Sequence, residues 1–296
     1  MTCELAVVGL VYFEIDCPRV ALAPRSGQEL WVARLPVRLG GCLNTASVAA
    51  ALGVDAAMAH PRGDGLTDVA AASVVERLGL RAVTWPSGPD PAVSLVFRDG
   101  GDRAFVSAAD LGALAACPPL PAARWIHVAG LHEAYAVASR LAEARRRGAT
   151  ISVSASWAPD LLAALRRERD QPWDLLFMNG AELARAAAGV DGDEPPWRAV
   201  AGAARELVVT HGGGAALYRD GVVAEAASEP VEVVDATGAG DAFVAGVIAG
   251  RLRGRDDPAA LALGVAAARR ILGVAGGVAL DPTRFADLRP DPAEAS

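Results

Sequence analysis

Short apolar segments that read as strands alternate with helical segments along most of the 296-residue chain. The strand-like segments lie at 5–9, 54–59, 81–85, 124–129, 149–154, 173–178 and 206–210. Segments with helical apolar spacing lie at 66–79, 133–147, 159–169, 180–188, 197–204, 240–252 and 257–272. Because parallel strands need a crossover and a helix usually supplies it, this alternation predicts an α/β fold: a mostly parallel sheet with helices on both faces.

Two parts of the chain do not fit this alternation. Residues 11–17 and 29–37 read as strands with no helix between them, and 93–97 with 103–106 read as a hairpin around Asp99–Asp102. We expect these insertions, at about 11–37 and 91–107, to form a small accessory sheet that can act as a lid. No repeat, low-complexity tract or linker divides the chain, so residues 1–296 are predicted to form a single domain.

Composition narrows the classes of partner. The net charge is −7, which argues against a nucleic acid or an acidic membrane surface as partner. No apolar run is long enough to span a bilayer, and the first residues lack the basic start of a signal peptide. The scattered cysteines are expected to be free thiols in a reducing cytoplasm. The chain has no lysine, and this excludes a Walker-type phosphate loop, which needs one.

The segment Asp235–Asp241, DATGAGD, predicts an anion site. It follows an alternating segment, 231–234, with strand character, and it precedes the helix expected at 240–252. The first backbone amides of a helix lack internal partners, and Gly238, Ala239 and Gly240 leave them open to a phosphate. Asp241 beside them is placed to take a proton from an attacking hydroxyl. The alternative is that Asp241 is only an acidic residue at a helix N-terminus.

A second glycine motif, Gly40–Asn44, lies before a helix expected from Thr45 to Leu52. Its two glycines allow the backbone to approach a ligand closely, and Asn44 offers a donor and an acceptor to a pair of hydroxyls. Asn44 could equally serve as the N-cap of that helix.

These two motifs, about 190 residues apart, resemble the signatures of the ribokinase (PfkB-type) carbohydrate kinase family. The likeness extends to Asn179-Gly180-Ala181-Glu182, which is similar to the family's NxxE element, and to 208–212, which is similar to its nucleotide-side strand and turn. The matches follow the family's order and cover nearly the whole chain. The resemblance implies a ribokinase-like three-layer α/β/α sandwich with a β lid, and ATP-dependent phosphorylation of a hydroxymethyl group of a sugar.

The resemblance also implies roles for individual residues. Asp241 matches the catalytic base, and the amides of Gly238, Ala239 and Gly240 match the anion hole. Asn179 and Glu182 match residues that organise Mg²⁺, mainly through water, and Asp235 matches a carboxylate near a monovalent-cation site, with K⁺ as the candidate ion. The implied ATP-binding residues are Asn179, Thr210, Gly212, Gly214, Thr237, Gly238, Gly240 and Ala268. The implied substrate-binding residues are Glu14, Gly40, Gly41, Asn44, Phe97, Arg103 and Asp241.

Three departures from the family pattern leave the substrate open. Glu14 stands where the family usually has Asp, Ser154-Ala155-Ser156 stands where it has Asp-x-Asn, and the turn at 210–215 is one residue short. A nucleoside kinase of the same fold is one alternative, with lid aromatics such as Phe97 stacking on a base rather than only packing. A sugar- or nucleotide-binding module without catalysis is another. The exposed edge of a strand lid also predicts a homodimer formed through the lid.

Overall fold

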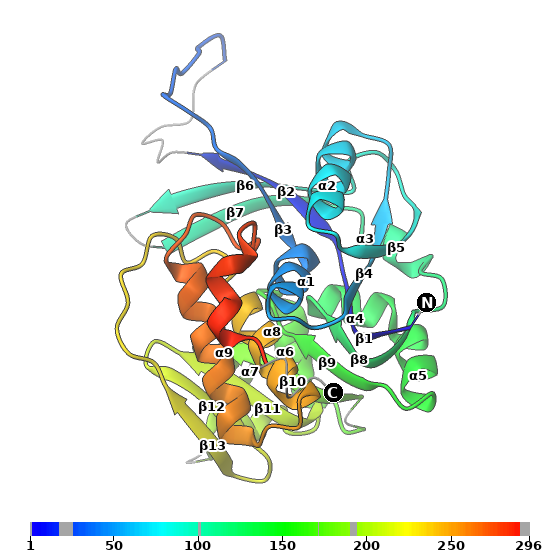
Figure 1. Cartoon of the computed structure of the whole chain (residues 1–296), viewed down its shortest axis with the longest axis vertical. Coiled ribbons are helices and arrows are strands. Elements are labelled where there is room, and N and C mark those ends of the chain that lie inside the picture. The colour runs from blue at the N-terminus through cyan, green and yellow to red at the C-terminus, as the bar shows by residue number, and fades with distance from the viewer. Residues whose placement is uncertain (1, 18–25, 100–101, 171, 190–193, 291–296) are drawn as a thin grey trace.

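The computed structural model describes residues 2–17, 26–99, 102–170, 172–189 and 194–290 (Figure 1). A nine-stranded sheet has the strand order β13-β12-β11-β10-β9-β8-β1-β4-β5. Neighbouring strands run parallel except in the pairs β11–β12 and β12–β13, which are antiparallel. Its strands are β1 (Thr2–Val8), β4 (Ala56–Arg62), β5 (Arg81–Pro86), β8 (Ala122–Val128), β9 (Thr150–Ser154), β10 (Trp173–Asn179), β11 (Ala204–His211), β12 (Gly214–Tyr218) and β13 (Val222–Ala227). The predicted mostly parallel sheet is therefore confirmed.

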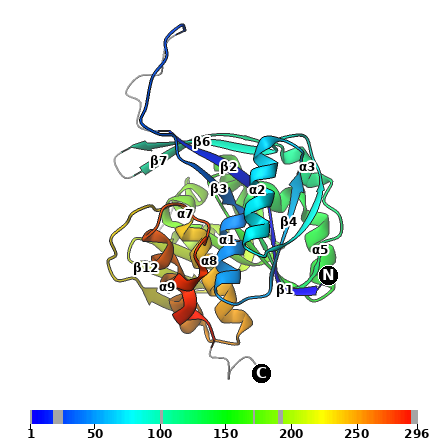
Figure 2. The same cartoon turned by 45° about the horizontal axis from the view of Figure 1, so that its top comes forward.

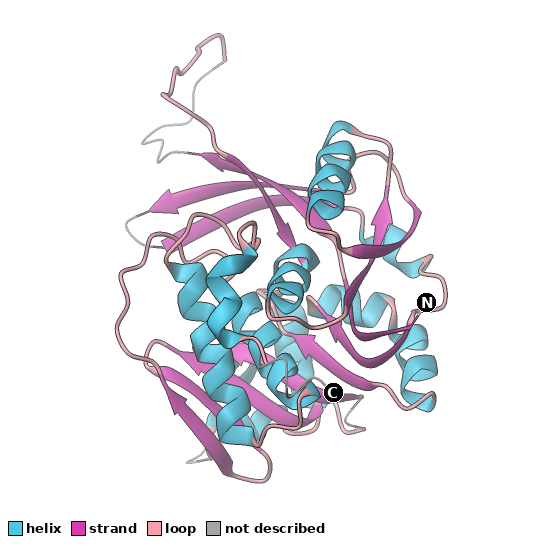
Figure 3. Cartoon of the chain, viewed as in Figure 1, coloured by secondary structure: helices cyan, strands magenta, loops and turns pink. Residues whose placement is uncertain are grey.

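Helices cover both faces of this sheet, as Figure 3 shows. They are α1 (Cys42–Ala51), α2 (Leu66–Arg77), α3 (Leu111–Ala115), α4 (Leu131–Ala136), α5 (Ala138–Arg146), α6 (Pro159–Ala164), α7 (Gly180–Ala187), α8 (Ala239–Leu252) and α9 (Asp257–Leu272). In β1, Leu5 and Val7 belong to the core beneath α1, α8 and α9, while Ala6 and Val8 belong to the core beneath α4 to α7. A strand buried on both faces needs the continuous apolar run seen in the sequence.

A second, four-stranded sheet has the order β3-β2-β6-β7. Its strands are β2 (Val11–Cys17), β3 (Val37–Gly41), β6 (Ala92–Asp99) and β7 (Asp102–Ala109). Figures 1 and 2 show it along the top of the molecule, above α1. The accessory sheet was therefore predicted correctly, although its action as a lid stays a prediction. No helix in the described ranges is long and apolar enough to cross a bilayer.

Two predicted strands are wrong. Residues 29–36 pair with no strand among the described residues, and Trp31 within them is 83% exposed. The strand begins instead at Val37, opposite Ile15, and runs to Gly41. Residues 231–234 are likewise a loop between β13 and α8, with Val234 61% exposed. In both segments the apolar alternation was present, but no strand among the described residues pairs with them. Strand β2 reaches the first segment next to the start of β3, with a backbone hydrogen bond from Asp16 N to Pro36 O at 2.8 Å.

Several helices differ in their bounds. Helix α1 begins at Cys42 rather than Thr45, so its N-cap is Gly41 and Asn44 lies inside the helix. The predicted helix 133–147 is broken at Val137 into α4 and α5, and the predicted helix 159–169 ends at Ala164 before a 3₁₀ turn. The segment predicted at 197–204 is a 3₁₀ turn, Pro196–Val200. Asn44 is therefore free of any capping role and can serve the site.

Candidate active site

The backbone at Gly238 sets up the start of α8. Gly238 is the N-cap and has φ of 75°, in the left-handed region. A Cβ on Gly238 would lie 2.3 Å from the Cα of Gly277, so only glycine fits this turn. A Cβ on Gly240 would instead meet no atom within 4 Å. There is therefore open space beside Gly240 in the first turn of α8, as an anion site requires, although the Ala239 N–H already donates to Ala236 O at 3.4 Å.

The side chain of Asn44 holds Asp241. Asn44 Nδ2 donates to Asp241 Oδ2 at 2.9 Å, although α1 and α8 lie 197 residues apart in the sequence. Asn44 is only 4% exposed, and its amide packs against Gly277, where a Cβ would lie 2.7 Å from its Oδ1. The Gly40–Asn44 motif thus contacts the DATGAGD motif. The side-chain amide of Asn44 orients the Asp241 carboxylate through a charge-assisted hydrogen bond.

A cavity of about 230 Å³ opens beside Asp241. Its lining includes Gly238, Gly240, Asn179, Glu182 and Thr210, and it also includes Ser154 and Ser156, which stand where the family pattern has Asp and Asn. The structure therefore brings together the predicted base, the glycine amides and the predicted metal-organising residues. Their roles stay predictions, but their meeting in one cavity is what those roles need.

Asn179 and Glu182 form a capping box at the start of α7. Asn179 Oδ1 accepts from the Glu182 backbone at 2.9 Å, and Glu182 Oε2 accepts from the Asn179 backbone at 2.8 Å. Burial raises the pKa of Glu182, with the Asp241 charge adding to the effect. Two carboxylates in a partly buried cavity fit a hard cation that prefers oxygen, such as Mg²⁺. No cluster of three or more acidic, histidine or cysteine side chains was found in the described ranges, so these residues would bind Mg²⁺ together with water or phosphate.

An adjoining cavity of about 240 Å³ is lined by Thr210, Gly212, Gly214, Gly240 and Ala268. It shares Thr210, Gly240 and Phe243 with the first cavity, so the two lie side by side. The short turn after β11 is a two-residue connection in which His211 pairs with Gly214. A Cβ on Gly214 would lie 2.0 Å from Ala226 O, which explains the glycine there. These predicted ATP-binding residues thus lie together, whereas Thr237 is buried and lines neither cavity.

Asp235 does not fit a monovalent-cation site. Its Oδ1 accepts from Thr237, from the backbone N at 3.0 Å and from Oγ1 at 2.7 Å. Its Oδ2 accepts from the Gly276 backbone at 3.0 Å and from the Arg38 guanidinium. These four donors, all from the described residues, match the roughly four lone-pair positions of a carboxylate. The expectation of K⁺ at Asp235 is therefore not supported by these contacts.

The other predicted substrate residues lie in or next to the small sheet. A Cβ on Gly40 would lie 2.3 Å from Glu14 Oε1, so Gly40 makes room for the Glu14 carboxylate. Gly41, with φ of 69°, turns the chain into α1. Phe97 lies in β6 and lines neither of the two cavities described above. The side chain of Arg103, in β7, falls outside the described part of the chain.

The sequence reasoning missed Glu133. It is a buried carboxylate in α4, 7% exposed, and burial raises its pKa. Its charge also contributes to the raised pKa of Tyr12 and of Cys42, so it lies in the region between β2 and the start of α1. A Cβ on Gly130 would lie 2.4 Å from Glu133 Oε2. A glycine three residues before an acidic residue, just after a strand, was the signal available in the sequence.

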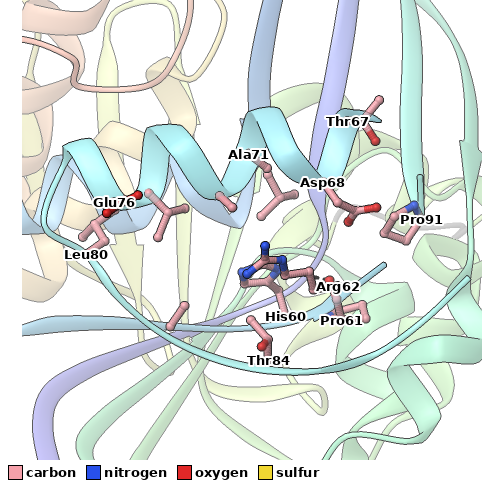
Figure 4. A pocket seen from close by; sticks show the side chains of 14 residues that line it. His60, Pro61, Arg62, Thr67, Asp68, Ala71, Glu76, Leu80, Thr84 and Pro91 are labelled. Carbon is pink, nitrogen blue, oxygen red and sulfur yellow. Dashed lines mark hydrogen bonds between the residues drawn. The ribbon is translucent and has the colours of Figure 1, made fainter. Parts of the chain in front are cut away.

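A separate cavity of about 390 Å³ lies between α2 and strands β4 and β5 (Figure 4). The buried ring of His60 lines it together with Arg62 and Thr84. None of the DATGAGD residues lines this cavity. It is therefore distinct from the candidate active site.

The fold and the site are those expected of a kinase: an α/β sandwich in which an acidic side chain and a glycine turn at a helix N-terminus line one cavity. The chain belongs to the pfkB family of carbohydrate kinases, because the model of that family matches residues 4–284. It is therefore a sugar or nucleoside kinase, an enzyme that transfers a phosphoryl group to a hydroxyl.

Solved structures of such kinases are similar to this chain. A Burkholderia thailandensis nucleoside kinase in complex with inosine has 20% identity and a TM-score of 0.76, with 97% of this chain and 100% of that chain covered. Arabidopsis thaliana ribokinase with ribose and ATP has 19% identity and a TM-score of 0.73, with 97% and 99% covered. At these identities the likeness shows the fold. It confirms the predicted ribokinase-like sandwich.

One curated relative shares a closer but shorter match. The 1-phosphofructokinase of Haloferax volcanii is 47% identical over 75 residues, which are 25% of this chain. The matched segment spans only 23% of that protein's length. This partial match supports a relationship to that enzyme but does not identify the acceptor substrate.

Proposed function

We propose that this protein transfers the γ-phosphoryl group of ATP to a hydroxymethyl group of a small sugar or sugar derivative, with Asp241 as general base. The observation that carries the proposal is that Asp241, held by Asn44 at 2.9 Å, lines the same cavity as Gly238 and Gly240. An acid that removes the hydroxyl proton must lie next to the group that binds the transferring phosphoryl. The sharing of that cavity also argues against a module that binds without catalysis.

We propose that ATP binds in the adjoining cavity, with its adenine toward Ala268 and its phosphates toward Gly240. Bound there, the γ-phosphoryl group would lie at the start of α8, where backbone amides would stabilise its developing charge. Mg²⁺, organised by Asn179 and Glu182 mainly through water, would neutralise phosphate charge. This chain's own residues orient the acceptor: Asp241 and Asn44 on the core, and Glu14, Gly40 and Gly41 at the small sheet.

The small sheet is proposed to act as a lid over the acceptor. It carries Glu14 and joins α1 directly through Gly41, so the strand that would close on a sugar continues into the helix that holds Asn44. Closure would exclude water, which otherwise competes as phosphoryl acceptor. Exposed apolar side chains on its edge strands, Val37 and Val106, support pairing of two lids in a homodimer. Light scattering at micromolar concentration tests this pairing, and a monomeric mass would contradict it.

The acceptor is tested with a panel of hexoses, pentoses, sugar acids, sugar phosphates and nucleosides, scored by ADP release in the presence of Mg²⁺. The proposal expects turnover with at least one sugar or sugar derivative. Turnover confined to nucleosides would identify the enzyme as a nucleoside kinase and overturn the choice of acceptor. Binding of acceptors by calorimetry without turnover of any of them would overturn the catalytic role. A cytoplasmic location stays a prediction.

A further inference from the structure

Arg38 reaches from the small sheet into the loop that precedes the anion hole. It lies in β3, and its Nη1 donates to Asp235 Oδ2, 197 residues later in the sequence. The side chain of Asp235 is 2% exposed and that of Arg38 is 20% exposed, so the ion pair is largely removed from water. A buried carboxylate needs a nearby positive charge, and in this structure the protein supplies it.

The loop around Gly276 leaves space for the Arg38 side chain. Gly276 has φ of 84°, and a Cβ there would lie 3.2 Å from Arg38 Cδ. The same glycine donates its backbone N–H to Asp235 at 3.0 Å. A larger residue at Gly276 would therefore press on the arginine and strain the backbone. The loop at 275–277 is shaped to admit a guanidinium beside Asp235.

The same guanidinium also binds the small sheet. Arg38 Nη2 lies 3.0 Å from Asp16 Oδ2 in β2. Asp16 is 8% exposed, so this second contact is also sheltered. One planar side chain thus connects the small sheet to Asp235, six residues before Asp241. A point charge such as K⁺ has no covalent link to the sheet, whereas an arginine has one.

We propose that the Arg38 guanidinium takes the place of a monovalent cation at Asp235, and that it makes the anion-hole loop independent of K⁺ while coupling it to the small sheet. Arg38 is a positioning residue: it balances the charge of Asp235 and fixes the turn 235–238 that aims the amides of α8. The consequence for catalysis rests on the proposed function, but the binding of ions at Asp235 does not.

The test measures thermal unfolding of the nucleotide-free protein in KCl and in tetramethylammonium chloride at one fixed ionic strength. The wild type is expected to unfold at the same temperature in both salts. Arg38→Ala is expected to unfold at a lower temperature in tetramethylammonium chloride. As K⁺ replaces tetramethylammonium, its unfolding temperature is expected to rise and reach a plateau, because Asp235 then regains a cation. Arg38→Lys, which retains the charge, is expected to remain insensitive to K⁺. Arg77→Ala is the matched control, since Arg77 and Arg38 line the same cavity of about 260 Å³ beside Gly276. Among the described residues Arg38, and not Arg77, forms the ion pair with Asp235.

The kinase assay supplies a second readout. Arg38→Ala is expected to lose roughly 10- to 100-fold in kcat without K⁺, as expected when a charged hydrogen bond is lost, and to regain activity with K⁺. Saturable stabilisation or activation of the wild type by K⁺ would overturn the proposal, and so would an Arg38→Ala protein that ignores K⁺ in both assays. If Arg38→Ala does not fold, the response of the wild type and of Arg38→Lys to K⁺ still tests the proposal: sensitivity of either protein to K⁺ would overturn it. If no acceptor is phosphorylated at all, the unfolding data still decide the ion question.

Discussion

Gly240→Ala separates the anion hole from the stability of the fold. Gly240 lies in the first turn of α8, and a Cβ there would contact nothing within 4 Å. Alanine in a helix is favoured over glycine by about 0.5–1 kcal/mol, so the variant should be as stable as the wild type or more so. The added methyl group would project into the open space where a phosphoryl oxygen is proposed to bind. The loss of one such donor contact lowers kcat by about 10²–10³-fold.

Gly238→Ala is the contrasting variant. Its Cβ would lie 2.3 Å from Gly277 Cα, and its left-handed φ costs an alanine about 1–2 kcal/mol. This variant should lose stability and activity together. Urea unfolding and ADP release, measured on both variants, compare the two effects. A Gly240→Ala enzyme with wild-type stability and wild-type kcat would refute the placement of the phosphoryl group at these amides.

Three further predictions follow from individual contacts. Asn44→Ala should lower kcat/KM by about 10- to 100-fold, because the hydrogen bond to the Asp241 carboxylate is lost. Calorimetry should show unchanged ATP affinity. Equal losses of kcat/KM and of ATP affinity would contradict this role. Glu182→Gln should raise the Mg²⁺ concentration for half-maximal activity about tenfold, and an unchanged Mg²⁺ titration would exclude Glu182 from metal binding. Burial lowers the pKa of His127 to about 3, so below about pH 6.5 the unfolded chain binds a proton that the folded chain does not. The free energy of unfolding should therefore fall by up to about 2 kcal/mol between pH 6.5 and 5. In urea unfolding, His127→Gln should flatten that pH dependence.

The layers of the fold were predictable because the buried strands carry apolar runs and four of them, β4, β8, β9 and β10, are followed directly by a helix. Residues 231–234 show the limit of that reasoning: their alternation is typical of a strand, yet they form an exposed loop. A strand also needs a partner at its edge, and the sequence does not say which edges are free. The strand predicted at 29–37 fails for the same reason, because pairing with β2 begins only at Val37.

The candidate site was predictable where function depends on the backbone. Gly238, Gly240 and Asp241 are adjacent in the sequence, and their local geometry follows from glycine and the helix start. Contacts between distant segments were not predictable in the same way. The hydrogen bond from Asn44 to Asp241 and the ion pair from Arg38 to Asp235 each join residues 197 positions apart, so they depend on the packing of whole elements.

The most direct test of the account is single-turnover phosphoryl transfer by Asp241→Asn, with ATP affinity measured on the same protein. Asp160→Asn, the same change at the exposed start of α6, is the matched control. The account predicts that Asp241→Asn binds ATP normally but transfers the phosphoryl group at least about 10²-fold more slowly, while the control is unaffected. Transfer by Asp241→Asn at the rate of the wild type would contradict it.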